Sequence, residues 1–175
     1  MSREAATDGL TQLANRRAFD GALERTLAEA SAGGCAVGLI LIDVDHFKAL
    51  NDTHGHTLGD EALRLVGRTL RSLGADGMMP ARYGGEEFAI IVADVTESSL
   101  RRITERIRRT IEETPLSHDG RVIPFTASLG AFHVDMTACN PTPLELIQRA
   151  DRCLYEAKEG GRNRVVVARA EPTRA

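Results

Sequence analysis

The chain has 175 residues, of which 42% are hydrophobic and 27% charged, and its formal net charge is −3. This length and composition suit one globular domain with a single hydrophobic core. The slightly acidic balance argues against a general nucleic-acid-binding protein, which would need a basic surface. An anionic ligand would have to be held by a local cluster of cations or by metal.

Cysteine usage and hydrophobic runs indicate a cytoplasmic domain with no membrane insertion. Cys35, Cys139 and Cys153 are odd in number and form no Cys-x-x-Cys pair, which favours reduced thiols over disulfides or a zinc site. The longest apolar run, Val37–Ile42, is too short to cross a bilayer. The N-terminus lacks the hydrophobic segment of a signal peptide.

In chain order, the first predicted elements are a helix, a strand and two more helices. Residues 15–32 are rich in Ala, Leu, Glu and Arg and end at a Gly-Gly pair, which is typical of a helix. Residues 36–42 form a continuous apolar run, which indicates a strand buried on both faces. A short helix over residues 46–53 and an amphipathic helix over residues 58–73 are expected next.

A hairpin and a further helix follow. Residues 74–80 are predicted to form a loop. The Gly-Gly pair at residues 84–85 separates a short strand from the apolar run 88–92, which is a hairpin signal. Over residues 100–111, an apolar stripe opposite several arginines predicts a helix.

The last predicted elements are a strand, a helix and a strand. Residues 122–134 alternate in hydrophobicity and predict a strand that is broken or bent near Gly130. Residues 142–145 form a capping box with proline at the first helical position, which opens a helix running to about Glu159. Residues 165–167 give a final short strand. This order predicts an α/β (α+β) domain in which helices cover one sheet that is at least partly antiparallel.

Two acidic groups could hold a hard cation. Asp43 and Asp45 follow the first strand, where side chains two apart point to the same face, and Glu86 and Glu87 follow the Gly-Gly pair. Magnesium binds a few carboxylate oxygens and leaves its other positions to water and phosphates. The same residues are also explained as turn formers and as solvated acids at a hairpin tip.

Two cations flank the Gly-Gly pair at the predicted C-terminus of the helix that follows the capping box. Lys158 and Arg162 could clamp phosphates, since Arg offers a planar fork and Lys a point charge. Alternatively, the helix macrodipole alone favours cations there. The residues by themselves leave both interpretations open.

Five separated segments of the chain carry recognisable motifs: residues 8–19 (DGLTQLANRRAF), 43–60 (DVDHFKALNDTHGHTLGD), 82–88 (RYGGEEF), 128–130 (SLG) and 149–163 (RADRCLYEAKEGGRN). In order and spacing, these segments together resemble the GGDEF family of diguanylate cyclases. The match extends over residues 8 to about 167. The resemblance implies a central, mostly antiparallel five-stranded sheet surrounded by helices, similar to the palm of polymerases and class III nucleotide cyclases.

The resemblance also implies a reaction and its metal ions. Two GTP molecules would be condensed into cyclic di-GMP and two pyrophosphates across a homodimer, each 3′-hydroxyl attacking the α-phosphate of the other nucleotide. Asp43, the Val44 carbonyl and Glu86 would hold two Mg²⁺ or Mn²⁺ ions per GTP. Glu86 would also assist deprotonation of the hydroxyl, and Glu87 would support metal binding. Lys48 completes the implied catalytic set.

The remaining matched positions would bind the nucleotide. They are Lys48, Lys158 and Arg162 for the β- and γ-phosphates, Gly84 and Gly85 for close approach of the hairpin backbone, Asn51 and Asp60 for guanine, and Phe47 and His56 beside the nucleotide. Guanine presents N1–H and N2–H₂ donors to the Asp60 carboxylate, whereas adenine does not. A buried acceptor left without its donors costs about 1–3 kcal/mol, which would favour GTP over ATP.

The chain departs from the family at the product-inhibition site. Where many relatives carry Arg-x-x-Asp before the Gly-Gly signature, residues 75–78 read Ala-Asp-Gly-Met. Arg106 matches a second arginine of that site, but an arginine on a charged helix is more typical of a solvated face. We therefore expect tight feedback by cyclic di-GMP through this site to be absent.

Three alternatives to a diguanylate cyclase are an inactive nucleotide-binding domain of the family, a cyclase that makes a mixed GMP–AMP dinucleotide, and an interaction module. The retained acids and cations disfavour the first, and Asp60 disfavours the second. We expect residues 1–175 to form a single catalytic domain, normally attached to or regulated by an N-terminal sensory segment. Catalysis would require the homodimer, so the isolated domain would depend on its concentration for activity.

Overall fold

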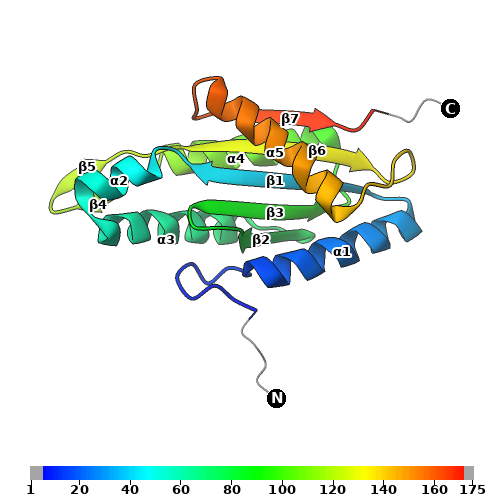
Figure 1. Cartoon of the computed structure of the whole chain (residues 1–175), viewed down its shortest axis with the longest axis horizontal. Coiled ribbons are helices and arrows are strands. Elements are labelled where there is room, and N and C mark those ends of the chain that lie inside the picture. Colours follow the sequence, from blue (N-terminus) through cyan, green and yellow to red (C-terminus); the bar gives the residue numbers. More distant parts are fainter. Residues whose placement is uncertain (1–5, 172–175) are drawn as a thin grey trace, which may run out of the picture.

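The computed structural model describes residues 6–171 as one sheet with helices on both faces (Figure 1). In chain order the elements are α1 (Arg16–Gly33), β1 (Ala36–Val44), α2 (Phe47–His54), α3 (His56–Leu73), β2 (Met78–Arg82), β3 (Glu87–Ala93), α4 (Glu97–Glu112), β4 (Leu116–His118), β5 (Arg121–Ile123), β6 (Ala127–Asp135), α5 (Pro143–Glu159) and β7 (Val165–Arg169).

The central sheet has the strand order β2-β3-β1-β6-β7, and β4 and β5 form a separate two-stranded hairpin. Within the central sheet only β6 and β7 run parallel, and the other neighbours are antiparallel. The predicted class, a mostly antiparallel five-stranded sheet surrounded by helices, is therefore confirmed. None of the helices in residues 6–171 combines the length and apolar composition needed to cross a bilayer.

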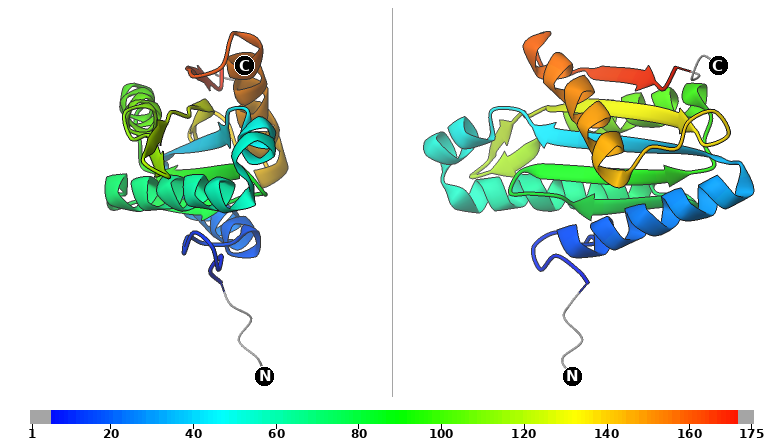
Figure 2. Two further views of the ribbon diagram at one scale, coloured as in Figure 1. Left: turned by 90° about the vertical axis from the view of Figure 1, so that its left-hand side faces the viewer. Right: turned by 45° about the vertical axis from the view of Figure 1, so that its right-hand side comes forward.

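Two hydrophobic cores lie on opposite faces of the sheet, and the end-on view shows the helices that cover these two faces (Figure 2). Because side chains alternate along a strand, Ile40 and Ile42 of β1 pack with α3 and α4, while Leu39 and Leu41 pack with α1 and α5. The strand is buried along nearly its whole length, as its continuous apolar run predicts.

Local signals set most helix ends close to their predicted places. The side chain of Asn15 accepts a hydrogen bond from the Ala18 N–H at the start of α1. At α5, Thr142 and Glu145 form the expected reciprocal capping box, with proline in the first turn. Gly55, at φ 89°, separates α2 from α3 and so turns one helix into the next.

The strand predicted over residues 122–134 is wrong in one respect. The break falls at residues 124–126, between β5 and β6, and Gly130 lies in the middle of the continuous strand β6. A side chain at this position would overlap the backbone N of Leu154 in α5. The glycine is therefore needed for close helix-to-sheet packing rather than for a bend.

Two further differences concern short strands. The predicted loop over residues 74–80 is too long, because β2 begins at Met78 and pairs with β3. The hairpin of β4 and β5 includes residues 116–118, for which no strand is predicted from the sequence. Strands of three residues carry too few side chains to show a period of two.

Candidate functional site

The end of β1 and the glycine hairpin bring the two predicted acidic groups together. Asp43 pairs with Glu87 across the antiparallel strands β1 and β3. The Val44 N–H donates to the Glu86 carbonyl at 3.3 Å, which fixes the hairpin against the strand end. Asp43 and Glu86 therefore lie on neighbouring strands at one edge of the sheet, although 43 positions separate them in the sequence.

Asp43 forms an ion pair with Lys158 of α5. The Lys158 Nζ donates to Asp43 Oδ2 at 2.8 Å, and the side chains are 32% and 11% exposed. Burial raises the pKa of the Asp43 carboxyl above its usual value, although the Lys158 ammonium opposes the shift. A buried carboxylate of this kind needs a cation beside it, and Lys158 supplies one.

Glu86 is half-buried beside this pair. Burial raises the pKa of its carboxyl, and the negative charges of Asp43 and Glu87 raise it further. Repulsion between carboxylates at one site is relieved by a cation placed between them. Two carboxylates and the Val44 carbonyl are oxygen donors suited to Mg²⁺ or Mn²⁺, which usually takes only one or two carboxylates together with substrate phosphates.

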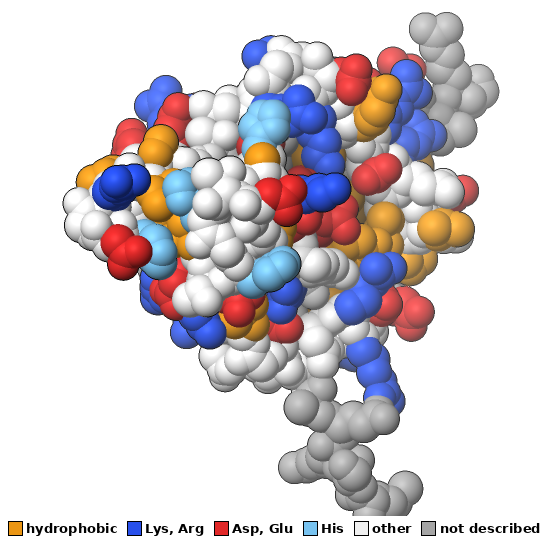
Figure 3. Space-filling view, turned by 60° about the vertical axis from the view of Figure 1, so that its left-hand side comes forward, with side chains coloured by type: hydrophobic (Ala, Val, Ile, Leu, Met, Phe, Trp, Pro, Cys, Tyr) orange, Lys and Arg blue, Asp and Glu red, His pale blue; other side chains and the backbone are white. Residues whose placement is uncertain are grey.

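No preassembled group of three His, Cys, Asp or Glu side chains with the geometry of a metal site occurs in residues 6–171. The acidic pair would therefore provide only part of the coordination shell of an ion. In the space-filling view of this end of the molecule, acidic and basic side chains lie next to one another at the middle of the face (Figure 3). Such a mixed surface suits a ligand that brings both anionic oxygens and metal.

Asp45 does not join the carboxylate pair, contrary to the hypothesis of a cation site shared by Asp43 and Asp45. Its Oδ1 accepts from Ser128 Oγ at 2.6 Å. Its Oδ2 accepts from Thr126 Oγ1 at 2.7 Å and from the Asn163 N–H at 3.0 Å. Three donors thus satisfy the buried Asp45 carboxylate within the protein, which leaves it a structural role.

The second predicted cation, Arg162, lies in the turn after α5. The helix ends at Glu159 with Gly160 as its C-cap, and the chain then passes through positive φ values of 118° at Gly161 and 62° at Arg162. The exposed Arg162 guanidinium lies near enough to Asp43 to lower the pKa of that carboxyl, against the larger effect of burial. The structure therefore places Lys158 and Arg162 beside the acids.

A corner between α2 and α3 holds the predicted guanine-binding residues. The amide oxygen of Asn51 is buried and has no hydrogen-bond partner among residues 6–171. A side chain on Gly59 would overlap this oxygen and come within 3.2 Å of the Phe47 ring. A buried acceptor without a partner is uncommon, and because this oxygen is covered beside Gly59, a ligand donor reaches it only when the Asn51 side chain turns outward. Asp60, the residue after Gly59 in α3, is exposed.

Lys48 and His56 are exposed on the first turns of α2 and α3. Within residues 6–171, no hydrogen bond or ion pair links either of them to Asp43 or Glu86. The structure thus gathers the acids with Lys158 and Arg162, and Asn51 with Phe47 and Gly59.

Arg82 and Asp8, to which the sequence analysis assigns no role, hold the glycine hairpin. The Arg82 guanidinium donates to the Gly85 carbonyl at 2.8 Å and to the Gly84 carbonyl at 3.2 Å, and it pairs with Asp8 at 3.1 Å. Asp8 also accepts from the N–H and hydroxyl of Thr11, both at 2.8 Å. The first and third motif segments thus meet and hold the glycine hairpin. The sequence hinted at this contact only in that both segments are among the five motif segments.

Comparisons with known proteins show what this chain is similar to. The sequence model of the family described as "Diguanylate cyclase, GGDEF domain" matches residues 5–164. The response regulator PleD of Caulobacter vibrioides is 43% identical over 165 residues, which are 93% of this chain and 36% of that protein. Diguanylate cyclase VdcA of Vibrio cholerae is 44% identical over 167 residues, covering 95% and 48% of the two chains.

A solved structure has the same fold. The GGDEF domain of DgcB from Caulobacter crescentus, determined in complex with c-di-GMP, superposes with a TM-score of 0.89 at 39% identity, covering 95% of this chain and 98% of that chain. The present chain spans less than half the length of the two curated relatives, 36% of PleD and 48% of VdcA.

Proposed function

The chain belongs to the GGDEF domain family of diguanylate cyclases, and from this premise we propose that it condenses two GTP molecules into cyclic di-GMP. In each half of the reaction, the 3′-oxygen of one nucleotide forms a bond to the α-phosphorus of the other. The bond from that phosphorus to the bridging oxygen of the β-phosphate breaks, and pyrophosphate leaves with the electron pair. The hydroxyl proton passes to a base of the enzyme or to water.

The observation that carries the proposal is the meeting of Asp43, Glu86 and Lys158 at the end of β1. We infer that Asp43, the Val44 carbonyl and Glu86 hold two Mg²⁺ or Mn²⁺ ions for each GTP. When bound, such ions neutralise phosphate charge and stabilise the attacking and leaving oxygens.

The side chains of this site divide the remaining tasks. Glu86, whose pKa is raised by burial and by its acidic neighbours, is suited to accept the proton of the 3′-hydroxyl. Lys158 would leave Asp43 and pair with the β- and γ-phosphates together with Arg162 and Lys48. Glu87 supports the position of Glu86 on the hairpin.

Guanine recognition is assigned to the corner of α2 and α3. The free amide oxygen of Asn51 and the carboxylate of Asp60 are acceptors for the N1–H and N2–H₂ groups of guanine. Phe47 and His56 lie on the same two helices, beside the proposed base. Adenine offers a different donor pattern, so we expect GTP to be preferred.

Two active sites must face each other, since one subunit holds one GTP in this scheme. We propose a homodimer as the active form and an N-terminal sensory or regulatory segment as its control in the full-length protein, acting in the cytoplasm. Alignment of the two bound nucleotides would supply the effective concentration for the bond-forming step.

The test is incubation with GTP and Mg²⁺, followed by chromatographic detection of cyclic di-GMP and pyrophosphate at several protein concentrations. The expected result is product formation that rises faster than linearly with protein concentration. Glu86→Gln should abolish product while the fold remains, and Asp60→Ser should reduce the preference for GTP over ATP. Full activity of Glu86→Gln would overturn the metal-site assignment, and binding of GTP without product would favour the inactive-domain alternative.

A further inference from the structure

The turn between α5 and β7 has an unfavourable backbone conformation. Gly161, Arg162 and Asn163 follow one another with φ values of 118°, 62° and 44°. Glycine adopts positive φ freely and Asn tolerates it, but an arginine in this region persists only where its surroundings hold it. This turn carries Arg162 and begins three residues after Lys158 of α5, so its conformation sets where Arg162 lies and how the end of α5 that bears Lys158 is held.

Asn163 supplies the contacts that hold the turn. Its N–H donates to Asp45 at 3.0 Å, which ties the turn to the end of β1. Its side-chain oxygen accepts from Arg108 Nη1 at 2.7 Å, and its side-chain nitrogen donates to Glu112 Oε1 at 2.7 Å. The Asn163 side chain is thus bonded at both ends to α4, an element 51 to 55 residues earlier in the chain.

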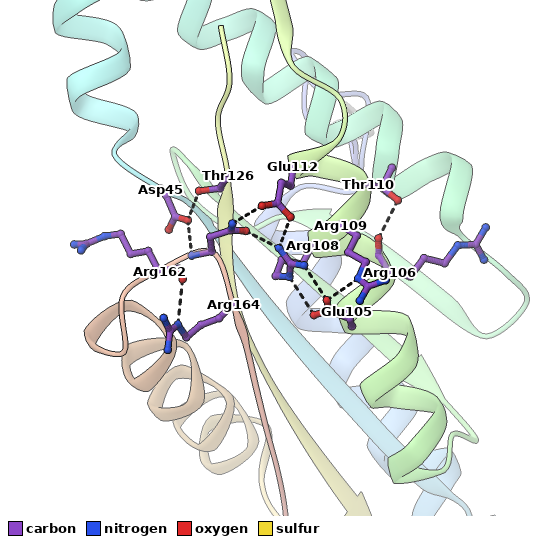
Figure 4. A network of polar contacts seen from close by, with 11 residues as sticks. Asp45, Glu105, Arg106, Arg108, Arg109, Thr110, Glu112, Thr126, Arg162 and Arg164 are labelled. Atoms are coloured by element: carbon purple, nitrogen blue, oxygen red, sulfur yellow. Dashed lines mark hydrogen bonds and ion pairs between the residues drawn. The ribbon is translucent and has the colours of Figure 1, made fainter.

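Arg108 is itself held in a single orientation. Its side chain is 12% exposed and pairs with Glu105 at 2.8 Å and with Glu112 at 2.6 Å. A second bond to Glu105, from Nε at 3.1 Å, fixes the plane of the guanidinium. The close view shows Arg108 between Glu105 and Glu112 on α4, while Arg162 points away from that helix (Figure 4).

We propose that Arg108 and Asn163 are positioning residues that hold the turn after α5 so that Lys158 and Arg162 face the phosphates of the nucleotide. This role rests on the proposed function, in which those two cations bind the β- and γ-phosphates. Neither Arg108 nor Asn163 needs to touch the substrate.

The geometry gives this contact a specific task during binding. The end of α5 is tied to the end of β1 through both Lys158–Asp43 and Asn163–Asp45. When Lys158 turns to phosphate, the first of these ties is broken. The Asn163 contacts to Asp45 and α4 then keep the turn in place, so their loss should weaken the grip on the triphosphate more than the binding of the base.

The experiment uses titration calorimetry in the presence of Mg²⁺ to measure the affinity of two ligands. One ligand is a non-hydrolysable GTP analogue, and the other is GMP, which lacks the β- and γ-phosphates. The variants are Arg108→Met, Asn163→Gly and the double variant. Glycine at position 163 tolerates the positive φ and keeps the N–H bond to Asp45, so the substitution removes the side-chain bonds and also makes the backbone more flexible. The control is Arg109→Met, a neighbour on α4 that also bonds to Glu105 but is 66% exposed.

We expect each single variant to bind the GTP analogue about tenfold more weakly, equivalent to about 1.4 kcal/mol. GMP affinity should change less than twofold, and the control should match the unmodified chain. The double variant should lose little more than either single one, because both substitutions remove the same contact. Unchanged affinity for the GTP analogue, or equal losses for the analogue and GMP, would refute the positioning role.

The two proposals fail in different ways. If the unmodified chain binds the GTP analogue but makes no cyclic di-GMP, the proposed reaction is wrong while the titration still tests the positioning role. If Arg108→Met lowers the melting temperature too far for titration, Asn163→Gly decides alone, because Asn163 is only half-buried and lies outside the cores.

Discussion

The free amide oxygen of Asn51 makes Gly59→Ala a direct test of the guanine-binding corner. A β-carbon at position 59 would overlap this oxygen and approach the Phe47 ring to 3.2 Å. Gly59 lies in the buried part of α3, whereas α2, which carries Asn51, has no fully buried residue. We therefore expect the Asn51 side chain to move and α3 to stay in place.

The size of the effect follows from the hydrogen bonds that Asn51 would no longer make. A buried acceptor that loses its partner costs about 1–3 kcal/mol, which corresponds to a weakening of GTP binding by about 5- to 150-fold. The fold should hold, because exchanging glycine for alanine within a helix favours the helix by up to about 1 kcal/mol and offsets the cost of moving one side chain.

The assay is the KM for GTP in the product assay, with ATP as the competing nucleotide and a thermal melt beside it. Gly59→Ala should raise the KM and reduce the preference for GTP, with a melting temperature close to that of the unmodified chain. Thr57→Ala, an exposed position on the same helix turn, is the matched control and should change neither. A Gly59→Ala variant with normal KM and normal GTP preference would refute the assignment of Asn51 to the base.

Three further predictions concern the acids and the packing. Burial and the nearby charges of Asp43 and Glu87 raise the pKa of Glu86, so the unmodified chain loses stability as pH rises through that pKa. Glu86→Gln should therefore stabilise the metal-free protein at pH 7 by less than about 1 kcal/mol, and it should give no gain at a pH well below the ordinary value of 4.5. Thermal melts with chelator at both pH values measure this difference. Burial raises the pKa of Asp8, but hydrogen bonds from Thr11 and the Arg82 charge lower it below its ordinary value, so stability that is present above pH 3.8 is lost as pH falls. Asp8→Asn should cost about 1–2 kcal/mol of unfolding free energy at pH 7 in a urea titration, and it should lower the turnover number. An unchanged turnover number would show that the Asp8–Arg82 ion pair does not position the glycine hairpin for catalysis. Gly130→Ala should destabilise by about 2 kcal/mol or more because a β-carbon strikes the α5 backbone, while Gly9→Ala, which has open space around it, should be neutral in the same titration.

The sequence predicted most helices and strands because the signal for each one lies in a few consecutive residues. The apolar run of β1, the capping box at Thr142 and the Gly-Gly pair of the hairpin all fix their structure within a few positions. Gly130 was misread because the reason for that glycine, the α5 backbone, lies outside the strand. A glycine in a strand has the same local signature whether it permits a bend or a close approach.

The contacts among the candidate site residues could not be read from the sequence. The resemblance named Asp43 and Lys158, but their ion pair joins residues 115 positions apart, a distance over which no periodicity extends. The contacts of Arg108 with Asn163 and of Arg82 with Asp8 are likewise long-range. Arg108 in particular has the same helical spacing as its solvated neighbours, so the sequence gives no sign that it is buried.

The two aspartates at the end of β1 show how one local pattern can serve two purposes. Asp43 lies within β1 and faces Lys158 of α5, whereas Asp45 lies just past the end of the strand and accepts three hydrogen bonds from the protein. A carboxylate with three donors has little capacity left for a metal ion, while one with a single, partly exposed lysine can exchange that partner. In the proposed reaction Asp43 must release Lys158, and Asp45 must not release the Asn163 turn. The difference in their bonding therefore matches the difference between a residue that takes part in binding and one that keeps its surroundings fixed.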